Sequence, residues 1–532
     1  MISIFLKTLS AFVLASMLSV PSFALSEVAD GPSSTVVIYN ANDLDSKDIA
    51  DFYCQARGVN PSHEIALAAP LSEEISRSDF DLTLARPLRE EFVQRGYWMI
   101  SKDIENRPSV VATQIRYVVL IRGVPLKIKE CESYPGDRQI QPPPVGTCNA
   151  SSVDSELSVL GLFTSQISGV VNNPCYQKTF DPSSKTTPPP SLLMVARLDA
   201  PTSKEVKSMI SAGLTAERVG LWGWGYIDLR SVGTGSYVEG DLWIKNAGDA
   251  LRREGIPVIT DDLPDTFPAG FPVTDASAYY GWYSENIDGP FADPMFQFVP
   301  GAVAFHLHSF SAATLRDPTK GWAAPFIVHG AAASLGNVYE PYLTLTTDLG
   351  VMCQALISGR NLAESFYASQ PVLSWMSVLL GDPLYRPYAM LCKTVATPTV
   401  WTDYRSIILN HGGNVLNAAH DLVVKARSTH ESLYLEALGA AQMDAGYLAS
   451  AETCFKDASK LAKDPRVTFR LLLEQARALE KEGDPLQGAS LLRRALSDFT
   501  SPKERELMLL WIARMDPPKP SPSASSGPTH SH

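Results

Sequence analysis

The chain has 532 residues, of which 45% are hydrophobic and 19% charged, as in an ordinary globular protein of two or three domains. Its formal net charge is -12, and no basic block offsets this charge anywhere in the chain. These features argue against a surface for nucleic acid or for an anionic membrane.

Residues 1–24 have the composition of a signal peptide. Lys7 precedes an apolar run that extends to Val20, and Ser22, Phe23 and Ala24 form a small-x-small cleavage signal. No later apolar run reaches the roughly 18 residues that a membrane-spanning helix needs. We therefore expect an exported protein, periplasmic or extracellular, whose mature chain has no integral membrane segment.

Seven cysteines bear on the redox compartment and on metal binding. Cys131 and Cys148 flank a proline-rich loop, so they are the expected local disulfide pair in an oxidising compartment. The chain has no CxxC motif and no Cys/His cluster with zinc spacing. We expect no structural metal and no cofactor.

The first α/β unit is expected over 33–130. The β-branched run 35–39 predicts a strand, and 45–57 predicts the helix that follows it. A second helix is predicted over 82–94 and a second buried strand over 116–122. Apolar strands that alternate with amphipathic helices indicate an α/β fold with mainly parallel sheets and flanking helices.

Residues 131–191 are expected to be a loop-rich connection. A small-residue turn at 150–157 leads into a helix, and its Asp154 precedes an apolar run. An aspartate in that position is more often a helix cap than a site residue. The cap is therefore the favoured interpretation of Asp154.

The second α/β domain is expected over 192–392. A strand at 192–199 ends with Arg197 and Asp199, and a helix is predicted over 203–217. The next strand, 219–226, is followed by Asp228 and Arg230; a helix over 240–254 and a strand over 256–260 come next. The charged ends of these strands should meet at one edge of the sheet, where α/β proteins build their sites.

The stretch 278–342 holds further candidate binding residues at strand ends. Tyr280 and Trp282, with Trp222, Trp224 and Tyr283, could form the aromatic walls of a groove for peptide or sugar, or could be core. Glu285, Arg316 and Glu340 extend the charged set. Arginines there could clamp a carboxylate or phosphate, but ion pairs that organise loops are the favoured interpretation.

Two histidines and a serine are the candidate catalytic residues. His306 and His308 are two residues apart, so on a strand they share a face and could bind a metal or relay a proton. The flanking Phe305 and Leu307 favour a buried core role for His306. Ser309 could be a nucleophile with His308 as base, but adjacent strand residues point to opposite faces, and the chain has no G-x-S-x-G motif.

Helix pairs are predicted over 425–515. The pattern of small and apolar residues at 438, 439, 446, 451, 455 and 458 resembles a tetratricopeptide repeat. A degenerate second copy matches Gly446 with Gly483 and Ala458 with Ala495. Two such units need a surface to pack on, either the α/β body or a partner. Residues 516–532 are expected to be a disordered tail.

The order of the predicted elements and the sequence of the second half resemble those of cysteine peptidases of caspase-like fold, in particular the gingipain group. The segments that carry the resemblance are 280–283 (YGWY), 305–311 (FHLHSFS) and 380–385 (LGDPLY). Trp282 stands where the group has its catalytic histidine, and the span 308–311, which contains no cysteine, stands where the group has its catalytic cysteine. The resemblance therefore implies the architecture without the thiol chemistry.

The chain up to about 387 also resembles an uncharacterised family of secreted bacterial proteins from species with exosortase-type sorting systems. The phrases that carry this resemblance are YNANDLDS, RGVPLKI, SSVDSELSVLG, ARLDAPT, YYGWYSEN, HLHSFSAATLR, GNVYEPY and LSWMSVLLGDPLYRP. The resemblance implies membership of that family and no particular activity.

Three functions are compatible with these sequence features. The first is a non-peptidase scaffold that acts in binding or assembly at the cell envelope. The second is a hydrolase, peptidase-like or esterase-like, with a site centred on Ser309 and His308. In the third, the C-terminal repeats bind an envelope protein or peptide and the α/β body is scaffold.

Overall fold

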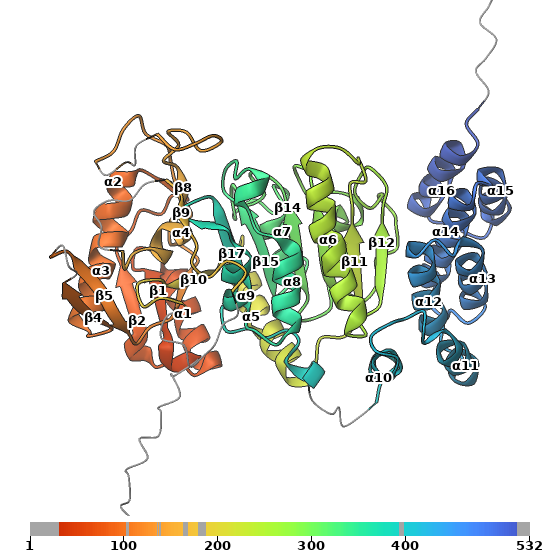
Figure 1. Ribbon diagram of the computed structural model, residues 1–532, viewed down its shortest axis with the longest axis horizontal. Helices are drawn as coiled ribbons and strands as arrows, with labels where there is room; N and C mark the ends of the chain where they lie inside the picture. The colour runs from red at the N-terminus through yellow and green to blue at the C-terminus, as the bar shows by residue number, and fades with distance from the viewer. Residues whose placement is uncertain are drawn as a thin grey trace, which may run out of the picture.

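A computed structural model of the protein describes residues 31–102, 106–135, 137, 140–162, 169–178, 188–392 and 398–518 (Figure 1). The expected signal peptide and all but the first three residues of the expected tail lie outside these ranges. Within the described ranges, every helix is too short or insufficiently apolar to cross a membrane.

A ten-stranded sheet forms the centre of the molecule, in the order β12-β11-β13-β14-β15-β17-β10-β6-β1-β2. Most neighbouring pairs are parallel, and β17 runs antiparallel to β15. The mainly parallel α/β fold expected from the sequence is therefore confirmed. The strands are β1 (Thr35–Asn40), β2 (Glu64–Leu67), β6 (Tyr117–Ile121), β10 (Met194–Leu198), β11 (Trp224–Asp228), β12 (Val258–Asp261), β13 (Ala276–Trp282), β14 (Val303–Leu307), β15 (Ala333–Asn337) and β17 (Ser377–Gly381).

The strands of 33–130 and 192–392 belong to one continuous sheet. Strand β10 pairs in parallel with β6, with Met194 opposite Tyr117 and Leu198 opposite Ile121. Every residue of β6, β10, β11, β13 and β14 is buried. Strands that are covered on both faces read as continuous apolar runs, which is why these segments were recognisable in the sequence.

Helices cover both faces of the sheet (Figure 1). Alternation along β13 shows this, because Tyr279 packs against Phe326 of α7 while Tyr280 belongs to the core cluster that contains residues of α6 and α8. The helices of the α/β body are α1 (Leu44–Arg57), α2 (Arg77–Phe80), α3 (Arg86–Gln94), α4 (Val153–Ser158), α5 (Ser203–Val219), α6 (Ser236–Arg253), α7 (Ala323–Val328), α8 (Leu349–Ile357) and α9 (Leu362–Ser369).

Three small sheets lie outside the central one. Strand β3 (Glu74–Ile75) pairs with β7 (Lys127–Ile128), which also pairs with β8 (Ser151–Ser152). Strands β4 (Trp98–Lys102) and β5 (Pro108–Thr113) pair antiparallel, as do β9 (Val171–Asn172) and β16 (Val372–Leu373).

Local signals set most element boundaries, and two elements differ from expectation. Helix α1 begins at the Asp43 cap and ends at Gly58, whose φ of 70° is the left-handed conformation that glycine tolerates. Strand β11 begins at Trp224, later than expected, because Gly220 and Gly223 have positive φ and form a turn first. The helix expected over 82–94 starts earlier, at the Ser76 capping box, and contains a π turn, η3 (Asp81–Ala85).

Two expectations for the connecting region are wrong. Ser152 caps α4 by accepting a hydrogen bond from the Ser155 amide, whereas Asp154 is buried and pairs with Arg197. A carboxylate that faces a buried guanidinium gains more from the ion pair than from a helix terminus. Cys131 and Cys148 are separate thiols, so the expected disulfide is not formed.

The C-terminal region is a run of helices beside the edge strand β12 (Figure 1). Gly446 and Gly483, the glycines matched in the sequence, both have positive φ in the turn that follows a helix. Residues of these helices belong to the same continuous apolar core as residues of the sheet. The helices are α10 (Val400–Asn410), α11 (Ala419–Thr429), α12 (Leu433–Asp444), α13 (Leu448–Ser459), α14 (Pro465–Glu482), α15 (Pro485–Ala495) and α16 (Pro502–Met515).

Charged side chains also join α14 to the body. Arg470 pairs with Glu436 at 2.7 Å and donates to the carbonyl oxygen of Pro272. Arg477 donates to the carbonyl oxygen of Thr260 at 2.9 Å, and its Nη1 lies 3.6 Å from Glu474 Oε1. Burial raises the pKa of Glu474 to about 7, although Arg477 opposes the shift. The helical region is therefore fixed to the sheet by buried polar contacts as well as by apolar packing.

Candidate functional site

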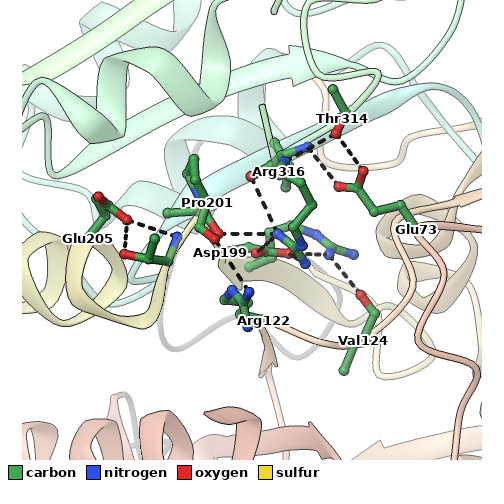
Figure 2. Close-up of polar contacts among 12 residues, drawn as sticks. Glu73, Arg122, Val124, Asp199, Pro201, Glu205, Thr314 and Arg316 are labelled. Carbon is green, nitrogen blue, oxygen red and sulfur yellow. Dashed lines mark hydrogen bonds and ion pairs between the residues drawn. The ribbon is translucent and has the colours of Figure 1, made fainter. Parts of the chain in front are cut away.

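The carboxyl ends of distant strands meet at one edge of the sheet, as expected. Arg316, in the loop after β14, donates a hydrogen bond of 2.6 Å to Asp199, which directly follows β10 (Figure 2). Arg122, which follows β6, donates to the carbonyl oxygen of Pro201 in the same region. This edge is where the sequence placed a functional site.

A buried ionic layer closes the edge beneath the surface. Arg197 is fully buried and pairs with Asp154 at 2.5 Å and with Asp199 at 3.1 Å. Its guanidinium also donates to the carbonyl oxygens of Val124 and Pro125. Burial raises the pKa of Asp154, and Arg197 opposes that shift. Protein groups accept hydrogen bonds from every nitrogen of the Arg197 guanidinium. This buried layer is therefore structural and has no free arginine donor for a ligand.

The loop after β14 is anchored on two sides. Glu73 accepts hydrogen bonds from the Thr314 hydroxyl and from the Leu315 amide (Figure 2). Lys127 donates to the carbonyl oxygen of Ala313 at 2.8 Å. Together with the bond from Arg316 to Asp199, these contacts fix residues 313–316 of the loop to the rest of the α/β body.

His306 is the centre of a buried chain of hydrogen bonds. The Ser284 amide donates to His306 Nε2 at 3.2 Å, so the ring proton lies on Nδ1, which is 3.0 Å from the Tyr279 oxygen. The Tyr279 hydroxyl then donates to Asp228 at 2.8 Å. Burial lowers the pKa of His306 well below its usual range, and the ring stacks on Trp322 with centroids 3.7 Å apart. His306 is thus a satisfied core histidine.

His308 and Ser309 do not form a base and nucleophile pair. Ser309 Oγ donates to Glu340 Oε2 at 2.6 Å, and His308 Nδ1 lies 2.5 Å from the Ser309 carbonyl oxygen. A carbonyl oxygen can only accept, so the imidazole uses its proton there. The acceptor of the serine proton is a carboxylate, which is a weaker base than imidazole.

The remaining candidate binding residues separate into a buried set and an exposed set. Asp228, Tyr280 and Trp282 are buried, and the Trp282 indole donates to Asp241 at 2.9 Å. Burial raises the pKa of Asp228 well above its usual range, and Asp261 adds to the shift. Glu285 and Glu340 are exposed. Only the exposed set can contact a ligand directly.

Exposed aromatic residues form the outer part of this edge. Tyr283, Phe310 and Tyr342 are 42%, 48% and 40% exposed, and they follow β13, β14 and β15. Each has positive φ, at 80°, 62° and 59°. A non-glycine residue in this conformation costs roughly 1–3 kcal/mol and persists where the surrounding structure enforces it. Three strained aromatics at adjacent strand ends are therefore the most distinctive feature of the edge.

Ring contacts and hydrogen bonds connect these aromatics with polar neighbours. Tyr283 packs edge-to-face on Tyr237 at 4.8 Å and lies 5.9 Å from the His308 ring, and the Arg230 guanidinium sits 4.8 Å from its centroid. The Tyr342 amide donates a hydrogen bond to Glu340, the carboxylate that also accepts a hydrogen bond from the Ser309 hydroxyl. We call this surface the aromatic rim: Tyr237, Tyr283, His308, Ser309, Phe310, Glu340 and Tyr342.

Sequence reasoning identified only part of the rim. Tyr283, His308, Ser309 and Glu340 were among the candidate residues, whereas Tyr237, Phe310 and Tyr342 were not. An aromatic residue within a few positions of the end of a buried parallel strand is a signal that would have found Phe310 and Tyr342.

Neither a metal centre nor a match to known proteins defines this edge. Among the described residues, no group of three or more His, Cys, Asp and Glu side chains is placed to hold a metal ion. Comparison of the chain with protein-family models, curated proteins and solved structures found no match.

Proposed function

We propose that this chain is an exported, non-peptidase scaffold of caspase-like architecture that binds a partner at the cell envelope through the aromatic rim. The observation that carries the proposal is the set of three exposed aromatic residues with positive φ that follow adjacent strands. Exposed rings contribute little to folding, and their backbone conformation costs stability. Exposed rings on a strained backbone therefore fit a surface that contacts another molecule.

The absence of peptidase chemistry in this proposal rests on two side chains. Trp282, which stands where the resembling peptidases have a histidine, is buried and bonded to Asp241. In the span that replaces the catalytic cysteine, Ser309 is bonded to Glu340 and not to an imidazole. A nucleophile and its base must lie within hydrogen-bond reach, and this pair does not.

The charge of the residues around the aromatic rim limits the kind of partner that the rim can bind. Glu340 is an exposed residue of the rim, Glu285 is exposed two residues after Tyr283, and the Arg230 guanidinium lies over the Tyr283 ring. Aromatic faces with flanking carboxylates suit a neutral or cationic peptide or a sugar, and they disfavour an anionic polymer.

The alternative in which tetratricopeptide-like repeats recruit a partner receives less support. Residues from α12 and α14 contact the body through Asp444, Arg470 and Arg477. Lys503 of α16 pairs with Asp293 of the body. The inner face of the helical region is thus occupied, and a recruited peptide would have to use the outer helices α13 and α15.

Site-specific photo-crosslinking tests the proposal. A benzophenone amino acid placed at Phe310 should give a discrete crosslinked product with envelope material, because this position is 48% exposed. The same amino acid at Met295, which is 86% exposed but outside the rim, is the matched control. Equal crosslinking at both positions, or none at Phe310, would reject the aromatic rim as the binding surface.

One observation keeps a hydrolase as a second candidate. The hydrogen bond of Ser309 to Glu340 at an exposed strand end could polarise a serine for acyl transfer. A fluorophosphonate probe would label the intact protein and not a Ser309→Ala variant if this were its function. We expect no labelling of either protein.

A further inference from the structure

A second site lies away from the aromatic rim, in a pocket of about 250 Å³ between the helix 77–94 and the segment that follows α4. Arg77, Arg86 and Arg89 line this pocket. Phe80, Leu160 and Leu162 give it an apolar wall. Three guanidinium groups beside apolar side chains form a combination that often binds a small anion.

The π turn η3 brings two of these arginines onto one side of the helix. In an uninterrupted α-helix, Arg77 and Arg89 would stand about 120° apart around the axis, because each residue turns the helix by about 100°. The π turn over Asp81–Ala85 contains one extra residue, which reduces this angle to about 20°. Interruptions of this kind occur frequently at functional sites.

The guanidinium groups of the pocket are incompletely satisfied. Arg77 is 4% exposed and pairs with Glu156 at 2.9 Å, yet its Nε is buried without a hydrogen-bond partner. Arg89 donates to the carbonyl oxygen of Leu160 at 3.1 Å, and neither Arg89 nor Arg86 has an ion-pair partner among the described residues. Burial lowers the pKa of Arg89, although the charges of Asp81 and Glu156 oppose the shift.

Acidic groups limit the charge of the ligand. Asp81, Glu90 and Glu156 also line the pocket. The Tyr134 hydroxyl donates to Asp81, and burial raises the pKa of this carboxyl. These carboxylates would repel a dianion such as a phosphate monoester more strongly than a single carboxylate.

We propose that this pocket binds a small monoanionic carboxylate with a short apolar chain. Arg89 and Arg86 hold the carboxylate, since a planar guanidinium matches its two oxygens, and Arg77 forms part of the wall. The apolar part lies against Phe80, Leu160 and Leu162. The site is independent of the aromatic rim and of the function proposed for it.

Isothermal titration calorimetry with the full chain tests this site, with sodium butyrate as the probe and inorganic phosphate as the dianionic comparison. A ligand of this size should bind with a dissociation constant on the order of 1 mM. Arg89→Gln should weaken butyrate binding about tenfold or more, because it removes a charge-assisted hydrogen bond. Arg218→Gln, at an exposed position on α5, is the matched control and should bind as the wild type does.

A second variant guards against a folding defect in Arg89→Gln. Arg86 is exposed and makes no ion pair among the described residues, so Arg86→Gln should fold normally and still weaken binding several-fold. The proposal is overturned if the wild type takes up no butyrate over the millimolar range, or if both variants bind it within twofold of the wild type. Tighter binding of phosphate than of butyrate would also overturn it.

Discussion

Asp199 accepts hydrogen bonds from two arginines that come from different parts of the sheet. Arg316 Nη1 approaches Asp199 Oδ1 at 2.6 Å, and Arg197 Nη1 approaches Asp199 Oδ2 at 3.1 Å. The carboxylate is fully buried. One side chain therefore connects the loop after β14, which carries part of the aromatic rim, to the end of β10.

Asp199→Asn is expected to lower the free energy of unfolding by about 3–5 kcal/mol, because it leaves a buried guanidinium with one fewer counterion. Urea denaturation followed by tryptophan fluorescence measures the change. The control is Asp48→Asn, which removes an exposed carboxylate 2.6 Å from Lys207 and should cost less than about 1 kcal/mol. Similar losses for both variants would contradict the structural role given to Asp199.

Phe310→Gly is expected to raise the free energy of unfolding by about 0.5–1 kcal/mol. Glycine relieves the strain of φ 62°, and this gain exceeds the added entropy of the unfolded chain. Thermal denaturation checks the sign. The same substitution at Met295, which is exposed and does not have positive φ, should give no stabilisation. A destabilised Phe310→Gly protein would show that the backbone strain at this position is negligible.

Glu474 should make stability depend on pH. Its pKa is about 7 in the folded protein and near the ordinary 4.5 in the unfolded chain, so the folded state binds the proton more tightly. The stabilisation is therefore fully present below pH 4.5 and is lost as the pH rises through 7, by about 3 kcal/mol in total.

Glu474→Gln isolates this contribution, since the amide resembles the protonated carboxyl. The variant should match the wild type near pH 4.5 and exceed its urea midpoint at pH 8. Glu482→Gln, an exposed position at the end of the same helix, should follow the wild type at both values. If Glu474→Gln kept the full pH dependence of the wild type, the assignment to Glu474 would be wrong.

Sequence periodicity predicted the α/β fold because the patterns that mark strands and helices lie within short stretches of the chain. The runs at 35–39 and 116–122 are rich in β-branched and other apolar residues, and the structure buries both strands within the sheet apart from the half-buried Tyr39. The meeting of strand ends at one edge also followed from parallel topology, and the bond between Arg316 and Asp199 confirms it.

The partners of individual side chains were not predictable in the same way. The favoured cap role of Asp154 was wrong because its partner, Arg197, lies on a strand that only the folded sheet brings near. The core role favoured for His306 is confirmed. Its stacking on Trp322 could not be predicted, because Trp322 lies where a loop enters a helix and the sequence there has no strand pattern. The left-handed backbone of Phe310 has no signature in composition at all.

The contact of Arg477 with Thr260 covers a polar backbone group at the edge of the central sheet. β12 is an edge strand, and the carbonyl oxygen of Thr260 accepts the Arg477 guanidinium while the Thr260 hydroxyl donates to Asp444. An uncovered edge strand is a template for pairing with another chain. The C-terminal helices thus shield the sheet against edge-to-edge aggregation, and their removal should produce insoluble protein before it reveals any loss of binding.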